Sequence, residues 1–166
     1  MELPKRKPNR LKDFDYNTPG YYFITICTKE KRKILGEVVG TGVLDGPSVQ
    51  LSPYGKVAEK QLCTMGNFYD DMVLEKYVIM PNHIHMLLHI LDRGNGPSGR
   101  PVPTNSKVAS FVGTFKRFCN RLCGTNMWQY RFHDHIVRGE DDYLKIWNYI
   151  DTNPAKWTED CFYIEE

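Results

Sequence analysis

Residues 83–90 largely alternate between polar and apolar side chains, a pattern that is typical of a β-strand with one buried face. Successive side chains on a strand point to opposite faces, so every second residue shares a face. One face is wholly apolar and consists of Ile84, Met86, Leu88 and Ile90. That face should lie on the core, while His83 and His85 should point together from the opposite face.

Similar patterns predict the other elements of the chain. The predicted strands are 21–28, 34–39, 73–80 and 133–137, and the predicted helices are 53–65, 106–122 and 141–153, with a glycine-rich loop at 40–46. Ser52 followed by Pro53 is a helix-start signal, because serine caps the first turn and proline fits the first helical position. Pro154 should end the last helix, because a residue that precedes proline disfavours helical geometry.

These elements follow one another as β-β-α-β-β-α-β-α, with strand pairs adjacent in sequence. The order favours an α+β sandwich, an antiparallel sheet with helices packed mainly on one face. The 166 residues suit one domain, since no repeat or change of composition indicates a second. Within the domain, 1–20 are expected to form a basic N-terminal extension, and 91–105 a flexible loop.

The last helix has an apolar stripe at helical spacing, made of Tyr143, Ile146, Trp147 and Ile150. At 100° per residue, Tyr149 lies about 110° and Asn153 about 70° from the centre of the stripe. A tyrosine at the edge of a cleft can act as a nucleophile if a cation or base promotes its ionisation, and an asparagine can offer a carbonyl ligand. Spacing alone favours an ordinary boundary tyrosine and a capping asparagine.

The composition is that of an ordinary globular protein, with 41% hydrophobic and 25% charged residues, which argues against disorder. A net charge of only +2 argues against a wholly basic, histone-like binder. Local basic clusters can still attract phosphate, although solvated surface explains any one of them as well. The candidate DNA contacts are basic residues from these clusters and one tryptophan. They are Lys5, Arg6, Lys7, Arg10, Lys31, Arg32, Lys116, Arg117, Trp128 and Arg138.

Five cysteines at irregular spacing do not form a disulfide framework. No segment resembles a signal peptide or approaches the roughly 20 apolar residues of a membrane span. We therefore expect no membrane association and a reducing, cytoplasmic setting. Cys119 and Cys123 can share a helix face, but buried thiols explain them better than a zinc site.

His83 and His85 are candidate metal ligands, since two imidazoles on one strand face can bind one divalent cation through neutral ring nitrogens. Two surface histidines on a half-solvated strand would give the same pattern, and strand geometry alone leaves both interpretations open. His89 lies on the same face but further along the strand, so its role stays open.

Several segments together resemble the HUH single-tyrosine transposases. Tyr77–His85 (YVIMPNHIH) resembles their HUH segment, while Trp128–Arg138 (WQYRFHDHIVR) and Tyr149–Pro154 (YIDTNP) resemble the REP-associated branch. The stretch from Arg10 to Glu30 and Val112–Lys116 (VGTFK) are also similar. A His-x-His pair alone is weak evidence for this family. The matching segments occur in the same order over nearly the whole chain, however, which makes the set as a whole specific for it.

The resemblance implies a ferredoxin-like or RRM-like domain in which His83 and His85 bind Mg²⁺ or Mn²⁺ and Tyr149 is the nucleophile. Related transposases complete the metal site with a glutamine one turn after the tyrosine, whereas this chain has Asn153 there. Asparagine keeps the carbonyl ligand but is one methylene shorter. The implied substrate is single-stranded or hairpin DNA, cut through a 5′-phosphotyrosine intermediate by a monomer or homodimer.

Two other function classes remain open from sequence. A catalytically inactive nucleic-acid-binding domain would explain the basic clusters, but it gives no reason for both histidines and the tyrosine. A histidine phosphoesterase working through His83, His85 and His89 is less well supported, because the spacing of the third histidine does not match those enzymes.

Overall fold

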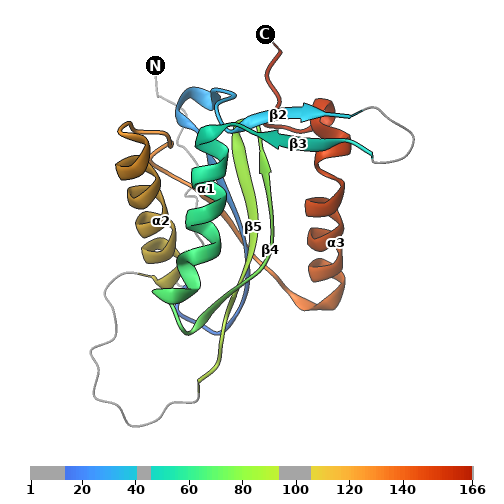
Figure 1. Ribbon diagram of the computed structural model, residues 1–166. Helices are drawn as coiled ribbons and strands as arrows, with labels where there is room; N and C mark the ends of the chain where they lie inside the picture. The colour runs from blue at the N-terminus through green and yellow to red at the C-terminus, as the bar shows by residue number, and fades with distance from the viewer. Residues whose placement is uncertain (1–13, 41–45, 94–105, 166) are drawn as a thin grey trace, which may run out of the picture.

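The computed structural model describes residues 14–40, 46–93 and 106–165, which form a four-stranded sheet, a small hairpin and three α-helices (Figure 1). The strands are β1 (Gly20–Cys27), β2 (Gly36–Val39), β3 (Ser48–Leu51), β4 (Met72–Met80), β5 (His83–Ile90) and β6 (His133–Ile136). The α-helices are α1 (Pro53–Thr64), α2 (Lys107–Cys123) and α3 (Gly139–Thr152). Three short 3₁₀ helices are η1 (Lys29–Lys31), η2 (Met65–Asn67) and η3 (Pro154–Glu159). No helix in these described ranges is long and apolar enough to cross a membrane.

The main sheet has the strand order β4-β5-β1-β6, and every neighbouring pair is antiparallel. Without the separate β2–β3 hairpin, the chain runs β-α-β-β-α-β, which is the ferredoxin-like arrangement. The structure therefore confirms the expected α+β fold. Met80 pairs with His83 across the turn at Pro81 and Asn82, so β4 and β5 form the expected hairpin.

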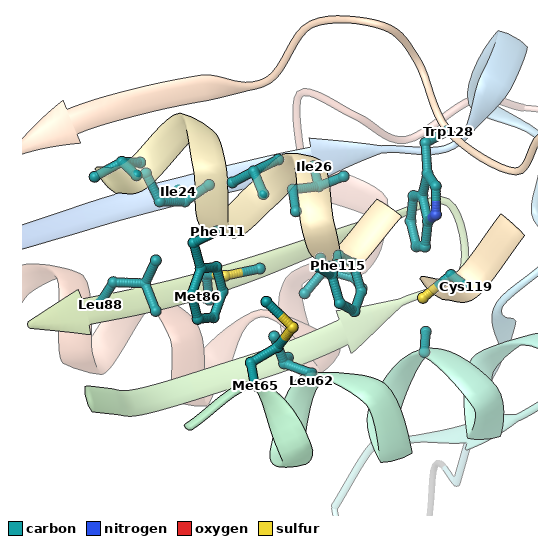
Figure 2. Packing of buried hydrophobic residues seen from close by; sticks show 14 of the residues in the cluster. Ile24, Ile26, Leu62, Met65, Met86, Leu88, Phe111, Phe115, Cys119 and Trp128 are labelled. Atoms are coloured by element: carbon teal, nitrogen blue, oxygen red, sulfur yellow. The ribbon is translucent and has the colours of Figure 1, made fainter. Parts of the chain in front are cut away.

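The main hydrophobic core lies between the sheet and the pair α1 and α2, which cover one face (Figure 1). Figure 2 shows this packing, with Phe111 and Phe115 of α2 and Leu62 and Met65 of α1 against Ile24, Ile26, Met86 and Leu88 of the sheet. All four residues of the predicted apolar face on β5 are 0% exposed. The alternation in β5 thus predicted the buried face correctly.

Helix α3 covers the opposite face of the sheet (Figure 1). Its predicted apolar stripe is confirmed, since Ile146 and Ile150 pack on Leu87 of β5, and Tyr143 and Trp147 flank them. Helices thus lie mainly on one face, as expected, but the third helix closes over the face that carries the histidines. This arrangement brings residues of α3 next to His83 and His85.

The ends of the helices follow the predicted signals with one difference. Ser52 caps α1, because its Oγ accepts a hydrogen bond from the Gly55 N–H at 3.1 Å, and η3 begins at Pro154 after α3 ends. Helix α3 begins at Gly139, two residues earlier than expected. The carboxylate of Asp142 accepts the Arg138 N–H at 2.9 Å and so supports the early start.

Three segments differ from the sequence prediction or lie beyond it. Strand β3 was not predicted, because its four residues carry no strong pattern and its pairing with β2 defines it. At the end of the expected basic extension, Phe14 and Tyr16 pack on the core. Most of the predicted flexible loop, residues 94–105, lies outside the described residues.

Candidate active site

The histidines of β5 sit in the interior under α3. His83 is 0% and His85 is 1% exposed, and their ring centroids are 4.4 Å apart. The sequence correctly predicted that both side chains share one face, but a half-solvated surface position is wrong. Burial is the largest effect on both rings and lowers the pKa of His83 to about 3 and the pKa of His85 below its usual value. Both imidazoles are therefore neutral near pH 7, the form that binds a cation.

Each histidine is held through its Nδ1 atom. The Nδ1 of His83 lies 2.8 Å from Oδ1 of Asn82, and the Nδ1 of His85 lies 2.8 Å from Oγ1 of Thr25 on β1. Outer hydrogen bonds of this kind orient imidazoles at metal sites and leave Nε2 available. Both Nε2 atoms are 3.9 Å from the same carboxylate oxygen, Oδ2 of Asp160.

Helix α3 and the residue that follows it contribute the tyrosine and the asparagine predicted for the site. Tyr149 is 38% exposed, and its Oη lies 3.4 Å from Nε2 of His85. Asn153 is 2% exposed and follows α3 directly, so the turn at Pro154 holds it beneath the tyrosine. The structure thus brings together all four residues expected to carry catalysis or bind metal: His83, His85, Tyr149 and Asn153.

Asp160 is a member of this cluster that the sequence did not predict. Its Oδ2 accepts hydrogen bonds from Oη of Tyr149 at 3.1 Å and from Nδ2 of Asn153 at 2.8 Å. Burial alone would raise the pKa of Asp160, but interactions with His85, the Phe162 N–H and Asn153 outweigh it and lower the pKa. Asp160 is therefore a buried carboxylate that carries a negative charge beside the tyrosine hydroxyl.

The protein groups around Tyr149 favour the protonated form of its hydroxyl. Burial, followed by the charge of Asp160, raises the pKa of Tyr149 above its ordinary value. A neighbouring cation would oppose both effects, because it stabilises the phenolate. The site therefore needs a positive charge before Tyr149 can act as a nucleophile near neutral pH.

The donor atoms of the cluster fit a divalent cation. The Nε2 of His83 and Oδ1 of Asn153 are buried and have no hydrogen-bond partner among the described residues. Such orphaned acceptors are costly unless a ligand satisfies them. One ligand atom each from His83, His85 and Asp160 lies within 4.8 Å of the others. Neutral imidazoles combined with amide and carboxylate oxygens are suitable ligands for Mn²⁺ or Mg²⁺.

A pocket of about 360 Å³ opens beside the cluster, and Tyr149, Asn153 and Asp160 line it together with Lys156. Neither His83 nor His85 lines this pocket. A ligand in the pocket would therefore meet Tyr149 before either histidine. Two larger hollows lie elsewhere, one beside the β2–β3 hairpin and one along α2.

Asp160→Asn is expected to lower the pKa of Tyr149 in the metal-free protein, because the substitution removes a negative charge that disfavours the phenolate. Ionisation can be followed by ¹³C NMR at tyrosine Cζ across pH in the presence of chelator. Asp151→Asn is the matched control, since the carboxylate of Asp151 on α3 pairs with Lys76 at 2.6 Å instead. An unchanged or higher pKa in Asp160→Asn would contradict the assigned cause.

Two of the candidate DNA contacts are engaged inside the protein. Trp128 is 3% exposed and packs on Phe115, so its indole belongs to the core and is not free to stack on a base (Figure 2). Lys116 donates to the backbone carbonyls of residues 129–131 at 2.7, 3.3 and 3.2 Å. Burial lowers the pKa of Lys116 to about 8. Lys116 therefore holds this segment against α2.

The other candidate contacts are scattered over the surface or lie outside the described residues. Lys5, Arg6, Lys7 and Arg10 belong to the part of the chain that is not described. Lys31 lies over the ring of Phe162 at 5.5 Å, and Arg32 and Arg138 are exposed. Arg117 is exposed and lines the α2 hollow of about 680 Å³.

His89, whose role the sequence left open, and His135 both have structural partners. Nδ1 of His89 lies 3.2 Å from Glu75, and its ring stacks on Tyr21 with centroids 4.1 Å apart. Nε2 of His135 lies 2.8 Å from Oδ2 of Asp142, which supports the start of α3. His89 is therefore no part of the His83–His85–Asp160 cluster, and this weakens the three-histidine phosphoesterase hypothesis.

No family model matches the chain. A protein of uncharacterized function from Haemophilus influenzae is 29% identical over 175 residues, covering 96% of this chain and 94% of that protein. A chain described as a candidate transposase from Deinococcus radiodurans R1 aligns at a TM-score of 0.42 and 17% identity, covering 86% of this chain and 95% of that chain, too low an overlap to support a shared fold.

The solved structure of a REP-associated tyrosine transposase bound to a REP hairpin overlaps much better. Its TM-score is 0.64 at 18% sequence identity, and the alignment covers 92% of this chain and 74% of that chain. The likeness therefore extends over most of the chain and shows a shared fold. The protein has the fold of the REP-associated tyrosine transposase.

Proposed function

We propose that the protein is a metal-dependent single-strand DNA endonuclease and strand transferase of the HUH single-tyrosine kind, which acts on single-stranded or hairpin DNA in the cytoplasm. The observation that carries this proposal is the position of Tyr149. Its hydroxyl lies 3.4 Å from one buried histidine and 3.1 Å from a buried carboxylate, at the mouth of a pocket. A structural tyrosine at a helix edge needs none of these neighbours.

The chemistry of the step follows from these neighbours. Oη of Tyr149 attacks the phosphorus of a phosphodiester, and its proton passes to Oδ2 of Asp160, which already accepts that hydrogen bond. The Oη–P bond forms, the P–O3′ bond breaks, and the departing 3′-oxygen takes up a proton from water to become a hydroxyl, while Asp160 releases the tyrosine proton to solvent. The 5′-phosphate stays on Tyr149, so another 3′-hydroxyl can reverse the step and join two strands without external energy.

His83, His85 and Asn153 would hold the divalent cation, and the carboxylate of Asp160 lies beside them. When bound, the cation supplies Lewis-acid polarisation of the scissile phosphate and favours ionisation of the phenol. Thr25 and Asn82 keep both imidazoles in place from behind. Helix α3 excludes bulk water from the histidines, which strengthens electrostatic interactions within the cluster.

Single-stranded DNA or the unpaired flank of a hairpin is the proposed substrate, because the scissile phosphate must reach Tyr149 in a narrow pocket. The fold relative was solved with a REP hairpin, which makes hairpin oligonucleotides the first substrates to test. Base pairing would hold the strand against its partner, whereas an unpaired strand can bend into the pocket.

The direct test is incubation of the protein with labelled hairpin oligonucleotides that carry single-stranded flanks, in Mn²⁺, in Mg²⁺ and in chelator. A labelled protein–DNA adduct on denaturing gels, present with a cation and absent with chelator, is the expected result. Hairpin binding without any adduct in either cation would instead favour a catalytically inactive binding domain. Release of mononucleotides without an adduct would favour a phosphoesterase.

Arg117→Ala is expected to weaken hairpin binding and to lower the slope of log affinity against log salt by about 1, as loss of one phosphate contact does. Arg117 is exposed, its Nη2 donates only to Oγ1 of Thr114 among the described residues, and no acidic residue lines the α2 hollow. Fluorescence anisotropy in chelator at several salt concentrations measures both quantities. Lys60→Ala on α1 is the control for loss of one exposed charge. Equal slopes for both variants would refute a phosphate contact at Arg117.

A further inference from the structure

Asn82 sits in the turn between β4 and β5, is 0% exposed, and uses its whole side chain in hydrogen bonds. Its Nδ2 donates to the backbone carbonyls of Lys31 at 3.2 Å and Phe162 at 2.8 Å. The backbone carbonyl of Asn82 accepts hydrogen bonds from the N–H and the hydroxyl of Thr28 at 2.9 and 3.1 Å. Turning the amide over would set its oxygen against two carbonyl oxygens, so the side chain has one orientation.

This orientation determines where the proton of His83 lies. Oδ1 of Asn82 faces the imidazole, 2.8 Å from Nδ1. An amide oxygen only accepts hydrogen bonds, so Nδ1 of His83 must carry the proton. A neutral imidazole has a single ring proton, and its Nε2 therefore keeps a free lone pair.

The surroundings of Nε2 agree with this assignment. Nε2 of His83 is buried and has no hydrogen-bond partner in the part of the chain that the structure describes, where the carboxylate oxygen facing it, from Asp160, is 3.9 Å away. A protonated Nε2 would have a ready acceptor in this carboxylate and would be expected to approach it. The 3.9 Å separation is too long for a hydrogen bond, as expected for two facing acceptors.

His85 provides a contrast within the same site. Its Nδ1 faces the hydroxyl of Thr25, which can donate or accept. The hydroxyl can therefore satisfy either tautomer of His85. Of these two histidines, His83 is the one whose Nδ1 partner accepts without being able to donate.

We propose that Asn82 is a positioning residue that locks His83 in the Nδ1–H tautomer and so presents an unprotonated Nε2 to the cation site. The assignment rests on the proposed function, in which Nε2 of His83 is a ligand. Asn82 links three segments at once, the β1–β2 connection, the β4–β5 turn and the chain after η3. The proton position is thereby set by backbone carbonyls that lie 51 and 80 residues from Asn82 along the chain.

The first test is long-range ¹H–¹⁵N NMR of the histidine rings in the metal-free protein with chelator, which distinguishes the two tautomers directly. The wild type should show His83 protonated on Nδ1, and Asn82→Ala should shift the proton toward Nε2. Asn82→Asp should keep Nδ1–H, because it retains the acceptor, although it loses the bonds to Lys31 and Phe162. Asn120→Ala is a matched control, since Asn120 bridges two segments far from the histidines and should leave the tautomer unchanged.

Mn²⁺ titration of the same variants adds a second measurement. Asn82→Ala should lose roughly 10- to 100-fold in affinity, the usual effect of removing an outer partner, whereas Asn82→Asp should bind better than Asn82→Ala. A purely structural role predicts instead that affinity follows thermal stability in both variants. A wild-type His83 protonated on Nε2, or an Asn82→Ala variant that keeps Nδ1–H, would overturn the inference. If the wild type has the expected tautomer but neither binds Mn²⁺ nor forms an adduct, the tautomer assignment stands and the proposed function fails.

Discussion

Replacing Tyr149 with phenylalanine is expected to abolish the covalent protein–DNA adduct and to lower strand cleavage by roughly 10³-fold or more. The substitution removes one oxygen, the atom that lies between His85 and Asp160, and leaves the ring against Phe23. Hairpin affinity should change little, and thermal stability should fall only modestly, because the buried carboxylate of Asp160 loses one donor but keeps its bonds from Asn153 and the Phe162 N–H. Adduct formation in Mn²⁺ on denaturing gels measures the first effect, and anisotropy in chelator measures the second.

The matched control for this variant is Tyr54→Phe, which removes a hydroxyl from a tyrosine of α1 that is 40% exposed, close to the exposure of Tyr149. This control should form the adduct at the wild-type rate. Persistence of the adduct in Tyr149→Phe would show that another residue is the nucleophile and would refute the role of Tyr149. Loss of the adduct together with loss of hairpin binding would indicate a defect in folding or recognition, which thermal unfolding separates.

Replacing His83 with alanine is expected to weaken Mn²⁺ binding by more than roughly 100-fold, because loss of a ligand exceeds the effect of losing its outer partner. Cleavage should fall accordingly and should recover only partly at high Mn²⁺ concentration. Isothermal titration measures the affinity, and adduct yield against Mn²⁺ concentration measures the recovery. DNA binding in chelator should be retained, since His83 is 0% exposed and cannot contact DNA directly.

His89→Ala is the control for this second experiment. His89 lies on the same strand and the same face as His83, but it pairs with Glu75 and stacks on Tyr21. The His89→Ala variant should bind Mn²⁺ with the affinity of the wild type. Equal losses in both variants would contradict a site centred on His83, and would revive a three-histidine arrangement.

Local patterns predicted those parts of the fold and the site that depend on periodicity. The alternation in β5 correctly predicted four apolar residues in the core. Helical spacing correctly predicted that Ile146 and Ile150 lie on the buried face of α3. The same geometry put His83 and His85 on one face. These predictions succeed because neighbours along a strand or helix have fixed directions that do not depend on the rest of the chain.

Local patterns could not predict the positions of residues that depend on tertiary contacts. Asp160 follows the end of α3 in an irregular segment, so no periodicity connects it with the histidines or Tyr149. Asn82 resembled an ordinary turn residue until its bonds to distant carbonyls were visible. Trp128 was expected to bind DNA, but its isolated position after a short polar stretch gave no sign of its packing on Phe115.

The sheet order has a consequence for the timing of synthesis. Strand β1 leaves the ribosome first, yet its neighbours in the sheet are β5 and β6, which are made much later. Tyr149, Asn153 and Asp160 follow later still, after both histidines. A nascent chain therefore carries His83 and His85 well before it carries Tyr149. A fragment that ends before α3 would have both imidazoles but neither the helix that covers them nor the proposed nucleophile, and could not form the proposed covalent link to DNA.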